Sequence, residues 1–209
     1  MRAAILLAGG RSRRFGRADK LEARISGRSL FDHALDRALA SVRGRVIVVA
    51  PVRRHRPRKR VHWVHAPASR TGMGGSLGAA LAALRPCERE ILIFLADMPF
   101  ATVPRAMRLT AGLDAVRPRV GEALGHPVLV RTAAGRAVRP SGDTGLVRRL
   151  DPGRIGTVRG GRGNLLDIDT RAALRRARMD RAVLRDVAPS TNKRSDAWSL
   201  QAGSHPRRR

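Results

Sequence analysis

The sequence predicts a single α/β domain with a Rossmann-like three-layer fold, in which helices cover both faces of a mostly parallel sheet. Segments typical of strands and of helices alternate along the chain. Several strand candidates are continuous apolar runs, which is typical of parallel strands buried on both faces. The length of 209 residues suits one such domain.

The elements follow in order. Residues 3–8 predict a first strand, and a loop rich in Gly, Ser and Arg follows over 9–20. Apolar residues at helical spacing predict a helix over 30–42. The other expected strands are 46–50, 61–64, 91–96, 127–130, 155–158 and 165–168, and the other expected helices are 76–84 and 170–179.

Two stretches do not fit the alternation. Residues 51–60 are Pro-rich and basic, and they link two strand candidates over fewer residues than a parallel crossover usually takes. We expect a degenerate helix or an irregular basic loop there. Beyond about residue 180 the chain becomes polar and loses its periodicity. The expected division is therefore a domain over 1–180 and a basic, disordered tail over 181–209.

The composition narrows the class of protein. A formal charge of +27 attracts polyanions, but the arginines are scattered and aromatic residues make up only 3% of the chain, which disfavours a nucleic-acid-binding protein. Cys87 is the single cysteine, so an internal disulfide is excluded and a reducing, cytoplasmic location is expected. The first apolar run is too short for a signal peptide or a membrane span, so no membrane partner is expected.

The loop after the first strand has the features of a phosphate site. Ligands of parallel sheets bind at the carboxyl ends of the strands, which points to the loops after residues 8 and 96. Gly9 and Gly10 let the backbone approach a ligand closely, and the loop amides can cradle phosphate oxygens. Arg14 and Lys20 can neutralise a polyphosphate from two sides. The P-loop and dinucleotide patterns are absent, and the alternative is a surface turn solvated by arginine.

This segment resembles the signature Leu-Ala-(Ala/Gly)-Gly-x-Ser-x-Arg-Met-Gly-x-x-Lys of MobA-like nucleotidyltransferases, in which the loop wraps a triphosphate. The resemblance implies that Arg14 and Lys20 contact the phosphates and that Lys20 stabilises the transition state. Phe15 replaces the Met of the signature, and one extra residue precedes Lys20. The implied nucleotide contacts of the loop are Leu7, Ala8, Gly9, Gly10, Ser12, Arg14 and Lys20.

Carboxylates at two places predict a Mg²⁺ site. Asp97 follows the strand candidate 91–96, and carboxylate oxygens are ligands that Mg²⁺ takes together with substrate phosphates. A lone Asp there is otherwise a helix N-cap. Asp97 to Phe100 match the family's metal-binding motif, so the resemblance implies a metal ligand and catalytic residue.

The second carboxylate comes from Asp167 or Asp169, which point to opposite faces if the chain is extended, so only one is expected to face the metal. The family pattern in this region favours Asp169, with Asp167 as the alternative. The other interpretation makes Asp169 or Thr170 the cap of the last helix.

Further motifs extend the resemblance over residues 3–178. The run 72–77 resembles a Gly-Met-(Ser/Gly)-Ser-Ser-Leu motif that lines the nucleotide site, which implies contacts by Gly74, Gly75 and Ser76; otherwise it is a turn with Ser76 as N-cap. His126 stands in a Gly-His-Pro-Val motif and either faces the acceptor substrate or is structural. Asp143 stands in a Gly-Asp-x-Gly motif and is interpreted as a cap or loop residue rather than a catalyst.

The resemblance is closest to the molybdenum cofactor cytidylyltransferases. It implies a nucleotide-diphospho-sugar transferase type of fold and transfer of CMP from CTP to molybdenum cofactor, with Mg²⁺ as cofactor and release of pyrophosphate. It also implies an NTP and a molybdopterin-type substrate as small-molecule partners, and a molybdoenzyme or chaperone as protein partner. Gly9-Gly10 is the form more often met in guanylyltransferases, so GTP is an alternative, and another phosphorylated acceptor is a second one.

Overall fold

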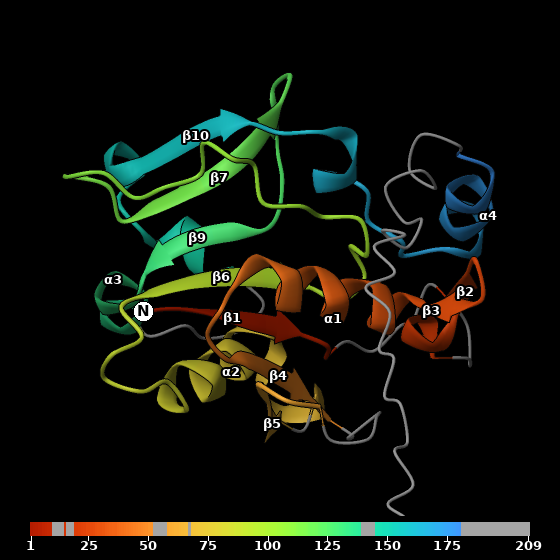
Figure 1. The fold of residues 1–209 in the computed structure, drawn as a ribbon, viewed down its shortest axis with the longest axis horizontal. Coiled ribbons are helices and arrows are strands. Elements are labelled where there is room, and N and C mark those ends of the chain that lie inside the picture. Colours follow the sequence, from red (N-terminus) through yellow and green to blue (C-terminus); the bar gives the residue numbers. More distant parts are fainter. Residues whose placement is uncertain (10–14, 16–18, 52–57, 67, 139–144, 181–209) are drawn as a thin grey trace, which may run out of the picture.

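A computed structural model of the chain describes residues 1–9, 15, 19–51, 58–66, 68–138 and 145–180, without the side chains of 68–71. Its centre is an eight-stranded sheet with the strand order β10-β7-β9-β6-β1-β4-β5, in which β8 also pairs with β7 (Figure 1). From one edge to the other, the strands are β10 (Ile155–Arg159), β7 (Ala115–Val120), β9 (Val128–Arg131), β6 (Glu90–Leu95), β1 (Arg2–Leu7), β4 (Val46–Ala50) and β5 (Val61–His65), with β8 at Ala123–Leu124.

The sheet is mostly parallel, as predicted. Strands β5, β4, β1 and β6 run parallel to one another, and β7 runs parallel to β10. Strand β9 is antiparallel to both of its neighbours, β6 and β7. Strand β9 is the one strand of this path that runs in the opposite direction. The sheet is therefore still mostly parallel, and the predicted fold class is confirmed.

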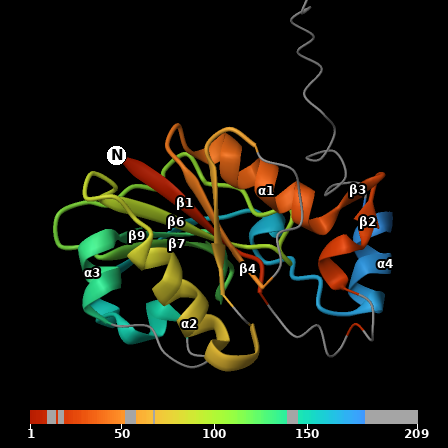
Figure 2. The same ribbon diagram turned by 90° about the horizontal axis from the view of Figure 1, so that it is seen from below.

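Helices cover both faces of the sheet (Figure 2). Helix α1 (Leu30–Ser41) packs on one face, where buried side chains such as Phe31 and Leu35 meet alternate residues of β1, β4 and β6. Helices α2 (Ala68–Ala82) and α3 (Thr132–Ala137) lie on the other face, where Leu77 and Leu81 meet the remaining residues of the same strands. Because each central strand is buried on both sides, its sequence is a continuous apolar run.

A smaller unit flanks the carboxyl edge of the sheet. It contains the two-stranded sheet β2 (Arg24–Ile25) and β3 (Arg28–Ser29), and helix α4 (Arg171–Met179), which lie side by side in both views (Figures 1 and 2). Its apolar centre consists of Phe15, Ile25, Leu30, Phe100, Ile168, Leu174 and Ala177. Short 3-10 helices complete the chain: η2 (Lys20–Glu22), η3 (Leu146–Arg149), η4 (Pro152–Arg154) and η5 (Arg162–Asn164).

Most of the predicted elements form within one or two residues of their expected bounds, but two predictions are wrong and several elements, among them β7 and α3, were not predicted. Residues 165–168 form no strand, because Ile168 is buried in the flanking unit and not paired in the sheet. Strand β7 was not predicted, since Arg117, Pro118 and Arg119 interrupt its apolar pattern. Helix α2 begins eight residues before its expected start at 76, with a kink at Gly72, whose φ is 56°.

Some expectations fall outside the described residues. The link 51–60 is described only at its ends, and the expected tail over 181–209 lies wholly outside. Where Arg58 emerges from the link, it pairs with Asp36 of α1 at 2.8 Å. Among the described helices, none is both long and apolar enough to cross a membrane.

Candidate active site

The carboxyl ends of β1 and β6 lie side by side. The two strands pair in parallel with Leu7 opposite Leu95, and the amide of Ala96 donates to the carbonyl of Leu7 at 3.0 Å. The two loops that the sequence selected therefore leave the sheet at one place. A small recess opens there, lined by Leu7, Gly9, Asp19, Lys20, Leu21, Ala96 and Asp97.

Lys20 reaches into this recess from η2. Asp19 caps that helix by accepting a hydrogen bond from the Leu21 amide at 3.0 Å, which holds the backbone next to Lys20. The Lys20 side chain is only 10% exposed. Its Nζ donates to Asp97 Oδ2 at 2.7 Å and also to Asp169 Oδ1, so the structure brings the predicted lysine and both favoured aspartates together.

Asp97 follows β6 in a turn, in which the Met98 amide donates to the Leu95 carbonyl at 3.1 Å. No helix begins at this turn, so Asp97 is not the helix N-cap that a lone Asp after a strand would otherwise suggest. The turn leaves its side chain 25% exposed and directed at the recess.

The two later aspartates come from the segment between η5 and α4. The Ile168 amide donates to the Asp97 carbonyl at 3.0 Å, which ties this segment to the end of β6. Thr170 caps α4 by accepting from the Ala173 amide at 3.0 Å, and this leaves Asp169 for the recess.

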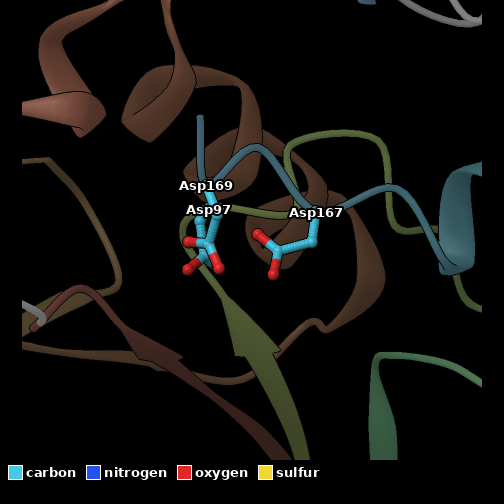
Figure 3. Close-up of side chains that lie close together, drawn as sticks. All are labelled: Asp97, Asp167 and Asp169. Atoms are coloured by element: carbon cyan, nitrogen blue, oxygen red, sulfur yellow. The ribbon is translucent and has the colours of Figure 1, made fainter. Parts of the chain in front are cut away.

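Both Asp167 and Asp169 turn toward Asp97, and one oxygen of each of the three carboxylates lies within 4.8 Å of the others (Figure 3). The expectation that only one of the pair would face the site is therefore wrong in its geometry. It assumed an extended strand, whereas the segment is irregular.

The charges of this cluster act on one another. Burial disfavours the Lys20 ammonium, but Asp97 and Asp169 outweigh that effect, so the pKa of Lys20 is raised. Asp167 lies at the exposed rim, yet desolvation by its surroundings, followed by the charges of Asp97 and Asp169, raises its pKa to about 7. Among the described residues, the carboxyl groups of Asp97, Asp167 and Asp169 lie close to the ammonium of Lys20.

The cluster suits a hard divalent cation. Its donors are carboxylate oxygens only, which is the donor set that Mg²⁺ and Mn²⁺ take together with substrate phosphates and water. Asp97, Asp167 and Asp169 each offer one carboxylate oxygen that could hold the ion. The structure therefore fits the predicted metal site in its chemistry.

The first loop and α2 meet beside this cluster. A Cβ added to Gly9 would lie 3.6 Å from the Ser76 Oγ, which places Ser76 next to the start of the loop. Gly74, Gly75 and Ser76 all lie within α2, and the Ser76 hydroxyl donates to the Gly72 carbonyl at 3.3 Å, so Ser76 is not the cap of a helix. The predicted residues Gly10, Ser12, Arg14 and Asp143 lie outside the described residues.

His126 precedes β9, whose first residue pairs with Ile93 near the carboxyl end of β6. Its Nδ1 lies 3.5 Å from the Ile93 carbonyl, and the Asn164 side chain donates to the His126 carbonyl at 2.7 Å. Desolvation lowers the pKa of His126 to about 4, with Asp97 and Arg117 acting on it in opposite directions. His126 is therefore a neutral, largely buried imidazole close to the predicted acidic site.

Arg117 of β7 was missed by the sequence predictions. Its Nη2 donates to the carbonyls of Leu124 and Gly125 at 3.2 and 3.3 Å, while its buried Nε has no hydrogen-bond partner. Desolvation lowers its pKa, and Arg148 of η3 adds to that shift. The available signal was a charged residue inside a β-type segment, where a cation is costly without an anionic partner.

Comparisons with known proteins agree with this architecture. A sequence profile of the MobA-like NTP transferase domain matches residues 4–153. No curated protein sequence matches the chain. A nucleotidyl transferase from Methanothermobacter, Mth528, has a TM-score of 0.71 at 20% identity, with 88% of this chain and 98% of that chain covered.

Three further solved structures, of two proteins, share the fold. Rv0371c from Mycobacterium tuberculosis has a TM-score of 0.70 at 23% identity, covering 85% of this chain and 97% of its own. A manganese complex of the same protein has a TM-score of 0.66 at 22% identity, covering 85% and 98%. The 2-C-methyl-D-erythritol 4-phosphate cytidylyltransferase from Thermus thermophilus has a TM-score of 0.61 at 19% identity, covering 88% and 100%.

Proposed function

Because the chain belongs to the MobA-like NTP transferase family and is thus a nucleotidyltransferase, we propose that it transfers CMP from CTP to molybdenum cofactor and releases pyrophosphate. The acceptor would be molybdenum bound to a molybdopterin-type ligand that carries a phosphate. Mg²⁺ would be the metal cofactor, and the reaction would take place in the cytoplasm.

One observation carries the proposal: the ammonium of Lys20 and the carboxylates of Asp97 and Asp169 meet at the carboxyl ends of β1 and β6. A triphosphate bound against the loop after β1 would have the lysine and the carboxylates within reach. This is the edge of a parallel sheet at which ligands bind. The manganese complex of Rv0371c supports a divalent metal for this fold.

The chemistry is a substitution at phosphorus. An oxygen of the acceptor phosphate forms a bond to the α-phosphorus of the nucleotide, and the bond from that phosphorus to the bridging oxygen of the pyrophosphate breaks. A divalent ion held by Asp97 and Asp169 would neutralise charge on the phosphates. Lys20, with Arg14, would bind the triphosphate and stabilise the charge that passes to the leaving pyrophosphate. Positioning and electrostatics are sufficient, and no covalent intermediate with the protein is needed.

The acceptor side of the site would include His126 and Arg117. The unpartnered Nε of Arg117 and the nearby Arg148 offer positive charge close to the start of β9. An anionic acceptor would supply the charge that the described protein groups do not supply to Arg117. A neutral His126 would meet the acceptor as a hydrogen-bonding group and not as a cation.

Two features favour neighbouring specificities as the second candidates. The pair Gly9-Gly10 favours GTP as the nucleotide. The likeness to a cytidylyltransferase of an alditol phosphate favours another phosphorylated acceptor. Both alternatives use the same lysine and carboxylates and differ only in the pockets for the base and for the acceptor.

An NTP panel tests the proposal. The purified chain is incubated with Mg²⁺ and molybdenum cofactor together with CTP, GTP, ATP or UTP, and pyrophosphate is measured. We expect pyrophosphate release with CTP and not with the other three nucleotides, and none when the acceptor is left out. Release with GTP alone would establish the guanylyltransferase instead. If 2-C-methyl-D-erythritol 4-phosphate replaces molybdenum cofactor as the only productive acceptor, the proposed acceptor is wrong.

A further inference from the structure

Lys20 occupies the middle of the acidic cluster. Its Nζ donates to Asp97 at 2.7 Å and to Asp169, and these are the two carboxylates proposed to hold the metal ion. The ammonium thus lies where an ion between Asp97 and Asp169 would have to lie. With 10% of its side chain exposed, Lys20 is also less accessible than Asp97 and Asp169.

The two cations would be bound by the same two carboxylates, Asp97 and Asp169. A divalent ion and an ammonium a few ångströms apart repel each other, which opposes binding of both at once. Without any cation, the carboxylates of Asp97, Asp167 and Asp169 would lie together uncompensated. Nearby positive charge therefore stabilises the ionised cluster, and among the described residues Lys20 supplies it where a metal ion could do so instead.

We propose that Lys20 and the divalent ion compete for Asp97 and Asp169, so that the free protein excludes the ion and accepts it only together with the nucleotide. The nucleotide takes part because its phosphates offer Lys20 a new set of acceptors when the ion displaces it. This second half rests on the proposed function, whereas the competition itself does not.

The local structure allows the exchange to occur without refolding. Asp19 caps η2 and fixes the backbone at Lys20, while the lysine side chain has a four-carbon stem and a freely rotating ammonium. Gly9, at the start of the expected phosphate loop, lines the same recess as Lys20. A rotation of the side chain would be enough to carry the ammonium from the carboxylates toward a phosphate there.

A permanent ion pair is the competing interpretation. In that case Lys20 would stay on Asp97 whether or not metal and nucleotide are bound, and the ion would use Asp167 and phosphates alone. The two interpretations differ in what happens to metal affinity when the lysine charge is removed.

Mn²⁺ binding in the absence of nucleotide makes the distinction. Free Mn²⁺ is followed by electron paramagnetic resonance in the wild type, Lys20→Met, Lys20→Arg and Lys59→Met. Lys59→Met is the matched control, because it removes the same charge from an exposed position. We expect Lys20→Met to bind Mn²⁺ at least about tenfold more tightly than the wild type. Lys20→Arg and Lys59→Met should both stay as weak as the wild type.

A second measurement follows the wild type itself and needs variants only to assign its lysine resonances. The chain has three lysines, Lys20, Lys59 and Lys193, so the side-chain resonances of labelled lysine can be assigned by substitution. The Lys20 resonance should stay in place with Mg²⁺ alone and move when Mg²⁺ and CTP or GTP are added together.

Three outcomes would overturn the exchange. Equal Mn²⁺ affinity of Lys20→Met and the wild type is one, and tight Mn²⁺ binding to the free wild type is another. A Lys20 resonance that ignores Mg²⁺ with bound nucleotide is the third. Absence of Mn²⁺ binding to every variant, with and without nucleotide, would instead overturn the metal site of the proposed function.

Discussion

Arg45 and Glu88 form a two-pronged ion pair between the segments that precede β4 and β6. Arg45 Nε donates to Glu88 Oε1 at 2.9 Å, and Nη2 donates to Oε2 at 2.8 Å. The Arg85 amide donates to the same carboxylate at 2.7 Å, and the Glu88 side chain is only 2% exposed. The pair lies at the amino ends of the central strands, opposite the edge that carries Asp97, so it serves stability and not the site.

Breaking this pair should destabilise the fold strongly. Glu88→Gln leaves the half-buried Arg45 guanidinium without its buried anion, which costs about 3–5 kcal/mol of unfolding free energy. Urea unfolding of the purified variants measures it. The control is Asp36→Asn, which breaks exposed pairs with Arg28 and Arg58 and should cost about 1 kcal/mol or less. Similar losses in the two variants would contradict a buried structural pair.

His126 should make stability depend on pH between 6.5 and 4. Its pKa is about 4 in the folded chain and 6.5 as a free side chain, so the unfolded state binds the proton first as pH falls. The contribution is fully present above pH 6.5 and is lost progressively toward pH 4, amounting to about 3 kcal/mol at most. Unfolding free energy measured across this range should fall for the wild type relative to His126→Gln.

The test uses the difference in unfolding free energy between the wild type and His126→Gln, because Asp167 titrates in the same pH range and has the opposite effect on stability. Its raised pKa of about 7 contributes stability at low pH that is lost as pH rises through 7. Subtracting the His126→Gln curve from the wild-type curve removes the contribution of Asp167, which both proteins share. Parallel curves for the two proteins would show that His126 is exposed in solution.

Gly125 should tolerate no side chain. A Cβ there would lie 2.3 Å from the Asn164 carbonyl oxygen, which is backbone and cannot move aside easily. Gly125→Ala should lower the unfolding free energy by about 1–3 kcal/mol. Gly78→Ala in α2 is the matched control, since its Cβ meets nothing within 4 Å and helix propensity should add about 0.5–1 kcal/mol. Thermal unfolding of both variants should show shifts of opposite sign.

Asp97→Asn should abolish turnover and leave the fold intact. Loss of a metal ligand removes several kcal/mol of transition-state stabilisation, which is a loss of at least about a hundredfold in rate. Pyrophosphate release at saturating nucleotide and metal measures the rate, and circular dichroism checks the fold. Asp169→Asn should approach the same loss, whereas Asp167→Asn, at the exposed rim, should lose less. Unchanged turnover of Asp97→Asn would remove this residue from the metal site.

The elements that could be predicted from the sequence are those with a simple solvent environment. Strands β1, β4 and β6 are buried on both faces, so their residues are apolar without interruption. Helix α1 carries one apolar stripe and begins at Ser29, whose hydroxyl accepts from the Asp32 amide at 3.0 Å. Strand β7 was not predicted because Arg117 and Pro118 interrupt its apolar pattern. Residues 165–168 were wrongly predicted as a strand because their apolar residue Ile168 is buried in the flanking unit and not in the sheet.

The residue types expected at the site could be predicted from the sequence alone: a glycine loop with a lysine, an aspartate at the end of a buried strand, and an Asp-x-Asp pair before the last helix. These follow from local rules of chain geometry and from residue type. The packing of the folded chain was needed to see that both Asp167 and Asp169 turn toward Asp97, and that Lys20 lies between Asp97 and Asp169. Asp97 and Asp169 are 77 and 149 positions away from Lys20 in the sequence. No local sequence pattern specifies a contact that forms when one segment packs across the end of a sheet.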